Sequence, residues 1–284
     1  SWRELRGGSF GDDTVVVQPI LEAQSQTYLQ AHLGQDEAQD LWRRLDPRMR
    51  GLASTPLLLW LIKEAWLETR GDIPGNRGAL YANFIERMLR RDDDRKLNNQ
   101  VSREVRINAL QTLAFAMHRD EAVSYTRQQV KAIIPDEQTL TVLLVNGLLQ
   151  GNEIIRFAPH QTVQEHFAAR AIQAEVEREL NKPKPSFFKR IFSAPETTIL
   201  DTASDSWWAE TYIQLAGLTA NPNQLAQKIA EQNPWLAWWC VQEGQKVDPE
   251  TERVIQEQSE RLVDSNDVVD RRNAVQALLK LPQA

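Results

Sequence analysis

Apolar residues recur at every third or fourth position over most of this chain, which is the spacing of one face of an α-helix. Between residues 21 and 70 this period predicts three helices, of which the first ends at Gly34 and the last has Pro56 in its first turn. Short β-branched or apolar runs at 14–17 and 154–157 predict strands. Further helices are predicted over residues 79–91, 101–118, 127–134, 137–149, 207–218, 225–231, 235–243, 250–263 and 268–281. The chain is therefore predicted to be mainly α-helical.

The clearest change in the spacing of apolar residues, from that of a strand to that of a helix, lies around His160. The strand at 154–157 is followed by Pro159, and a helix is then predicted from Thr162, whose hydroxyl can cap it with Glu165 three residues further on. His160 thus stands between a strand end and a helix start, where a side chain can reach outside its own domain. A histidine in such a place is more often a structural hydrogen-bonding residue than a ligand contact.

Composition and charge narrow the class of protein. The chain has 284 residues, 42% of them hydrophobic, and a formal net charge of −6, which argues against a nucleic-acid-binding surface as its main purpose. A single cysteine cannot form an internal disulfide, and no apolar run approaches the ~18 residues of a membrane span. We therefore expect a cytoplasmic protein, and the start at Ser1 is typical of a piece of a longer chain.

The sequence lacks the residue patterns of several kinds of catalytic or binding site. None of the twelve glycines is followed by lysine, so a phosphate-binding P-loop is missing. His160 and His166 are six residues apart, which is not the i, i+4 spacing of two zinc ligands on a helix. Cys240 lies between tryptophan and valine and is predicted to be an inert core residue. We predict no catalytic residue and no metal ligand, so this chain alone is not expected to hydrolyse ATP.

One stretch nevertheless resembles a known family. The residues Phe157, His160, Gln164, Glu165 and Phe167-Ala168-Ala169 have the order and spacing found at the end of the winged-helix domain of NACHT proteins, which are signal-transducing STAND ATPases. The resemblance implies that His160 reaches the β-phosphate of bound ADP.

A second match precedes it by about a hundred residues. The segment 52–59 resembles the proline motif of the same family, and the resemblance implies that Pro56 packs on the adenine ring. The family often has glycine where this chain has Ser54. The residues that follow resemble the usual start of the winged helix: Ile73-Pro74, Arg77, Leu80-Tyr81 and Phe84.

The family resemblance and the helical spacing of apolar residues together predict five units along the chain. Residues 1–21 would be the end of an α/β nucleotide-binding domain, in which Arg3 is a candidate phosphate sensor, although a solvated surface arginine is the simpler interpretation. The remaining units would be a helical domain (22–74), a winged-helix domain (75–174), a linker (175–206) and HEAT-like superhelical repeats (207–284).

The implied function is the regulatory portion of a NACHT-type ATPase of signal transduction or defence. Pro56 and His160 would clamp ATP or ADP, with Mg, bound mainly by the P-loop domain of the parent chain. The C-terminal repeats would sense a protein or other ligand, and activation would lead to a homo-oligomer.

Two other functions remain open on the sequence. A nucleotide-independent α-helical scaffold could bind a protein through its C-terminal repeats, since five of the nine tryptophans lie between 207 and 239, although inter-helix packing is their more ordinary role. A winged helix could also bind DNA, but the candidate recognition helix at 136–146 is acidic at its start and apolar throughout. Nucleic acid and membrane are therefore not expected partners.

Overall fold

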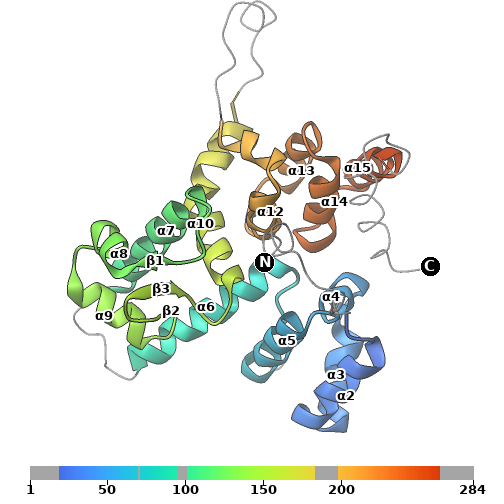
Figure 1. The fold of residues 1–284 in the computed structure, drawn as a ribbon. Helices are drawn as coiled ribbons and strands as arrows, with labels where there is room; N and C mark the ends of the chain where they lie inside the picture. Colours follow the sequence, from blue (N-terminus) through green and yellow to red (C-terminus); the bar gives the residue numbers. More distant parts are fainter. Residues whose placement is uncertain (1–18, 70, 95–100, 183–197, 263–284) are drawn as a thin grey trace, which may run out of the picture.

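The computed structural model describes residues 19–69, 71–94, 101–182 and 198–262. This part of the chain is mainly helical, as predicted, and its helices form three groups (Figure 1). We call residues 19–69 the first group, 71–182 the middle group and 198–262 the C-terminal group. The predicted strand at 14–17, Arg3 and the predicted helix at 268–281 lie outside the described residues. Within those residues, no helix combines the length and apolar character of a membrane span.

The first group consists of α2 (Glu22–Leu33), α3 (Gln35–Arg44), α4 (Pro47–Leu52) and α5 (Pro56–Thr69). α2 ends at Gly34, as predicted, because its φ of 85° lies in the left-handed region that glycine adopts without strain. Asp46 caps α4 by accepting a hydrogen bond from the backbone N–H of Met49 at 2.9 Å. α5 begins at Pro56, which confirms the predicted place of this proline in a first turn, where its missing N–H leaves no helical bond unmade.

The middle group combines helices with a small antiparallel sheet. Its elements are α6 (Arg77–Asp94), α7 (Arg103–Arg119), β1 (Tyr125–Thr126), α8 (Arg127–Ile133), α9 (Glu137–Val145), β2 (Leu149–Gln150), β3 (Ile154–Phe157) and α10 (Gln161–Leu180). β3 is the central strand, with β1 and β2 on its two sides. Tyr125 pairs with Ile155, and Leu149 pairs with Phe157.

One predicted helix is shorter in the structure. The period predicts a helix over 137–149, but α9 ends at Val145. Gly147, with a φ of 75°, turns the chain, and the backbone N–H of Ala158 then bonds to the carbonyl of Leu148. Leu149 is fully buried as a strand residue. An apolar run cannot by itself separate a helical turn from a strand edge, because both bury the same side chains.

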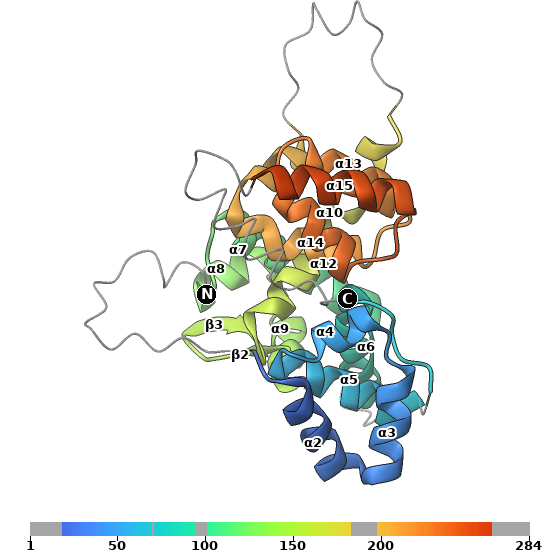
Figure 2. The ribbon, with the colours of Figure 1, turned by 90° about the vertical axis from the view of Figure 1, so that its right-hand side faces the viewer.

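The C-terminal group consists of short helices joined by tight turns. Its elements are η1 (Ile199–Ser204), η2 (Ser206–Trp208), α12 (Ala209–Ala216), α13 (Pro222–Ala230), α14 (Pro234–Glu243) and α15 (Pro249–Arg261). Trp208, Trp238 and Trp239 are buried between these helices, which confirms the packing role predicted for tryptophans of this region. Figure 2 shows this group above the first group.

Two hydrophobic cores meet inside α10. Phe167 and Ala168 belong to a core that extends through the first and middle groups, whereas Ile172 and Val176 belong to the core of the C-terminal group. α10 continues to Leu180, through the start of the predicted linker, because Val176 is still packed against the C-terminal helices. This one helix therefore contributes to both cores and connects the middle group to the C-terminal group.

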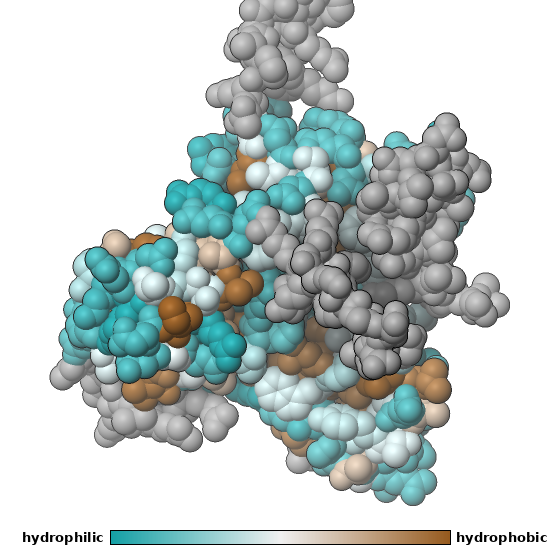
Figure 3. Space-filling model, in the orientation of Figure 1, coloured by the Kyte–Doolittle hydropathy of each residue, from teal (hydrophilic) through white to brown (hydrophobic). Residues whose placement is uncertain are grey.

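The described surface carries no broad apolar area on the face drawn in Figure 3. Hydrophobic residues there form small separate areas among polar ones. The most exposed large apolar side chains, those of Leu21, Val145 and Ile154, belong to three different segments. Single exposed apolar residues of this kind are normal on a folded protein.

Candidate functional site

His160 occupies the N-cap position of α10, directly after β3 and Pro159. Its Nδ1 accepts a hydrogen bond from the backbone N–H of Thr162 at 3.2 Å. The sequence predicted Thr162 as the cap, with Glu165 as its partner. The structure corrects this: the helix begins one residue earlier, at Gln161, because the imidazole nitrogen serves as the acceptor that a hydroxyl usually provides.

The bonds of His160 determine which ring nitrogen carries the proton. Tyr81 donates its hydroxyl to Thr162 Oγ1 at 2.7 Å, and this oxygen lies 3.1 Å from Nδ1, so that the threonine proton can also point to Nδ1. A ring nitrogen that accepts hydrogen bonds is unprotonated, and the neutral ring then carries its proton on Nε2. No hydrogen bond joins Nε2 to another described residue, and the side chain is exposed. Nε2 is thus a free donor.

The charge state of His160 agrees with this role. Desolvation by the neighbouring helices lowers the pKa of His160, and the positive charge of Arg77 lowers it further, so the ring is neutral at pH 7. His118 and His166 differ, since both are completely buried and burial lowers the pKa of each to about 4. Those two histidines are packing residues, whereas His160 keeps an open edge.

Pro56 lies exposed at the start of α5, and the loop before it is fixed by several bonds. Ser54 donates its hydroxyl to the carbonyl of Gly51 at 2.8 Å, and the Ser54 carbonyl accepts the backbone N–H of Ile20 at 2.9 Å. Ser25 donates its hydroxyl to the carbonyl of Ala53 at 3.0 Å. The pyrrolidine ring is therefore presented on a rigid loop.

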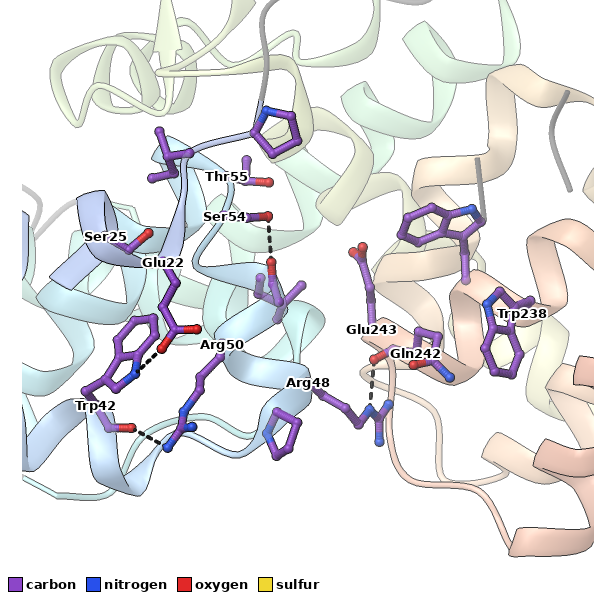
Figure 4. Close-up of a pocket in the computed structure, with 16 residues that line it drawn as sticks. Glu22, Ser25, Trp42, Arg48, Arg50, Ser54, Thr55, Trp238, Gln242 and Glu243 are labelled. Carbon is purple, nitrogen blue, oxygen red and sulfur yellow. Dashed lines mark hydrogen bonds between the residues drawn. The ribbon is translucent and has the colours of Figure 1, made fainter. Parts of the chain in front are cut away.

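A cavity of about 500 Å³ opens between the first group and α14 (Figure 4). In the figure, Glu22, Trp42 and Arg50 lie on the side of the first group, and Trp238, Gln242 and Glu243 lie on the side of the C-terminal group. The volume is typical of a small-molecule site. The charges of its lining, however, balance: two arginines, Arg48 among them, face two glutamates.

The two residues predicted to hold nucleotide are not brought together in this cavity. Thr55, which precedes Pro56, is in the cavity wall, but neither Pro56 nor His160 lines it. Glu243 in the opposite wall binds Arg77, whose charge acts on His160. Arg77 thus interacts both with a residue of the cavity wall and with the histidine.

Arg48 joins the first group to the C-terminal group. Its guanidinium donates to the carbonyls of Gln242 at 2.8 Å and Gly244 at 2.9 Å, and also to that of Val241. These carbonyls belong to the C-terminal end of α14, where helical acceptors lack partners and the helix dipole is negative. Arg48 had no distinguishing signal in the sequence, since its acceptors lie almost two hundred residues away.

Arg77, the first residue of α6, makes the corresponding link from the middle group. It binds Glu210 of α12 at 2.6 Å and Glu243 of α14. Burial alone would lower the pKa of Arg77, but these two carboxylates raise it, so the arginine stays charged. In the sequence only Arg77 stood out, as part of the family resemblance; neither glutamate did, because each is one of many on an amphipathic helix.

Other chemistry is limited in the described part of the chain. No group of three or more histidine, cysteine or acidic residues there is arranged to hold a metal ion. Cys240 is buried, and this burial raises the pKa of its thiol, as expected of an unreactive core residue. A scan of the sequence against protein-family models found no match, and neither did a search of curated proteins.

Proposed function

We propose that this chain is the regulatory portion of a NACHT-type STAND ATPase. In this proposal its helical and winged-helix parts close over ADP or ATP bound by a P-loop domain of the parent chain. The C-terminal helices respond to a ligand and couple the nucleotide state to activation and oligomerisation.

The observation that carries the proposal is the free Nε2–H of His160. A neutral imidazole with a fixed tautomer is a hydrogen-bond donor of defined direction, as a phosphate oxygen requires. The N-terminal turn of α10 adds a positive electrostatic potential in the same place. His160 would donate to the phosphate, and the exposed ring of Pro56 would cover the purine.

The arrangement of the middle group supports the winged-helix interpretation. α7 is followed by β1, α8 and α9, then β2 and β3 complete a three-stranded antiparallel sheet, and α10 follows it. α9 does not suit DNA recognition, because Leu140 and Leu143 are buried and its first turn carries Glu137. The sheet and α10 instead serve to present His160.

The alternative is a nucleotide-independent α-helical scaffold that binds a protein through its tryptophans. Burial of Trp208, Trp238 and Trp239 removes much of the aromatic surface that such a scaffold would use. We therefore favour the nucleotide clamp.

The experiment compares His160→Ala with the unmodified protein in the chain that carries the nucleotide-binding domain. A hydrogen bond to a charged group contributes ~1.5–3 kcal/mol, so we expect ADP to bind roughly ten- to a hundredfold more weakly by calorimetric titration. Activity without ligand should rise, because the closed state is less favoured. His32→Ala, at an exposed histidine of α2, is the matched control. Unchanged ADP affinity in His160→Ala would refute the clamp.

A further inference from the structure

Three helices from two groups converge on one buried guanidinium. Arg77 opens α6, Glu210 lies in the first turn of α12, and Glu243 ends α14. The arginine side chain is 15% exposed, and those of Glu210 and Glu243 are 23% and 11% exposed. Ion pairs shielded to this degree are screened by salt much less than surface pairs, and breaking one leaves a buried charge without compensation.

The backbones beside this cluster are in direct contact. A Cβ on Gly78 would lie 2.5 Å from the carbonyl oxygen of Gln214, and one on Gly217 would lie 2.7 Å from the backbone nitrogen of Gly78. α6 and α12 can approach this closely only because both positions lack side chains. The ion pairs therefore act across an interface with no space for water between the two helices at this point.

The same interface reaches the turn that carries His160. Tyr81 of α6 donates to Thr162 Oγ1 at 2.7 Å, and Gln214 of α12 lies 3.5 Å from the Thr162 carbonyl oxygen through its side-chain nitrogen. Thr162 in turn holds His160 Nδ1. Thr162, which fixes the histidine, is thus held both by α6, which carries Arg77, and by α12, which carries Glu210.

Glu165 of α10 adds a third carboxylate to the cluster. Gln161 donates to it at 3.0 Å. Burial and the charge of Glu210 raise the pKa of Glu165 to about 8, despite the opposing effect of Arg77. At neutral pH this carboxyl is protonated, so the charged carboxylates that pair with Arg77 are those of Glu210 and Glu243.

We propose that Arg77 is an electrostatic interlock that holds the C-terminal group against α6 and against the turn that carries His160. While the pairs with Glu210 and Glu243 are intact, the C-terminal group is held in place and Arg77 is fixed near the histidine. When a ligand or partner pulls α12 and α14 away, Arg77 loses both carboxylates and the turn loses its contact with Gln214. The interlock is a property of this chain alone and requires no nucleotide, so it can hold or fail independently of the proposed clamp.

The test uses Arg77→Met, which keeps the length of the side chain and removes its charge. The distance between spin labels at Thr141 on α9 and Glu260 on α15, both exposed, reports separation of the middle group from the C-terminal group. We expect the fraction of molecules with an increased distance to rise at least tenfold. Arg253→Met is the matched control, because Arg253 also binds two carboxylates, Glu250 and Glu257, but within α15 alone.

A second readout follows the histidine itself. Titration of His160 by nuclear magnetic resonance should show its pKa rise in Arg77→Met, because the positive charge of Arg77 lowers this pKa in the unmodified protein. Arg253→Met should leave it unchanged. This readout reports the charge of Arg77 beside the histidine, whereas the spin-label distance reports the contact between the groups.

A variant at the opposite side of the contact keeps the test decisive if Arg77→Met does not fold. Glu210→Gln combined with Glu243→Gln preserves side-chain shape and removes both negative charges. This double variant should increase the separated fraction as Arg77→Met does. Arg77→Lys, made in the unmodified protein, keeps the positive charge and should largely keep the closed distance. An unchanged distance distribution in the double glutamine variant would overturn the proposal.

Discussion

Replacing Glu165 with glutamine should make the protein more stable at pH 8 while changing its stability at pH 5 much less. Glu165 is 7% exposed, and the pKa of its carboxyl is raised to about 8, first by burial and then by the charge of Glu210. In the unfolded chain the pKa of this group is 4.5. The folded protein must therefore hold a proton that the unfolded chain has released.

The magnitude follows from linkage. A group with a raised pKa in the folded state contributes its full stability below pH 4.5, and this contribution is lost as the pH rises towards 8. Each pH unit in that window is worth 1.36 kcal/mol, so the shift from 4.5 to about 8 sets an upper limit of about 5 kcal/mol. Relaxation and water penetration reduce the cost of a buried charge in real proteins, and we expect a measured effect of roughly 1–3 kcal/mol.

The assay is urea denaturation of Glu165→Gln and the unmodified chain at pH 5, 6.5 and 8, followed by circular dichroism. The difference between the two proteins isolates Glu165, because His118 and His166 titrate in both. Their lowered pKa values stabilise the fold as the pH rises from about 4 to 6.5, which opposes the trend from Glu165. Glu250→Gln, at an exposed carboxylate of α15, is the control. Parallel pH profiles for Glu165→Gln and the unmodified chain would refute the reasoning.

Two further substitutions test the contacts between the groups. Gly78→Ala should destabilise the protein by roughly 1–3 kcal/mol in thermal unfolding, because its methyl group would meet the Gln214 carbonyl. Gly75→Ala is the control and should be neutral, because its methyl group would enter open space. Equal effects of the two substitutions would contradict the close contact. Arg48→Ala should lose roughly 1–3 kcal/mol in urea denaturation, because several carbonyls at the end of α14 lose their donor. Arg43→Ala, at an exposed arginine of α3, should cost much less, and a comparable loss there would show that Arg48 has no special part.

The prediction of helices from the sequence succeeded where one local signal was sufficient. Gly34 ends α2 and Pro56 opens α5, because the conformational preferences of these two residues act on the backbone alone. The position of His160 between a strand and a helix was also predicted, since the change from period two to period 3.6 is visible in a few residues. Its role as the cap of α10 was not, because the sequence offered Thr162 as a more usual capping residue.

The sequence by itself determined the mainly helical class, the start of α5 and the apolar character of the Trp-rich helix α14. Only the tertiary structure decided that Nε2 of His160 is free, that Arg48 caps α14, and that Arg77 lies between Glu210 and Glu243. The physical reason is the range of the interactions. Backbone preference and amphipathic period act within one or two helical turns, whereas these side chains meet partners on helices far away in the sequence, and nothing in a local pattern records which distant charge a residue will face.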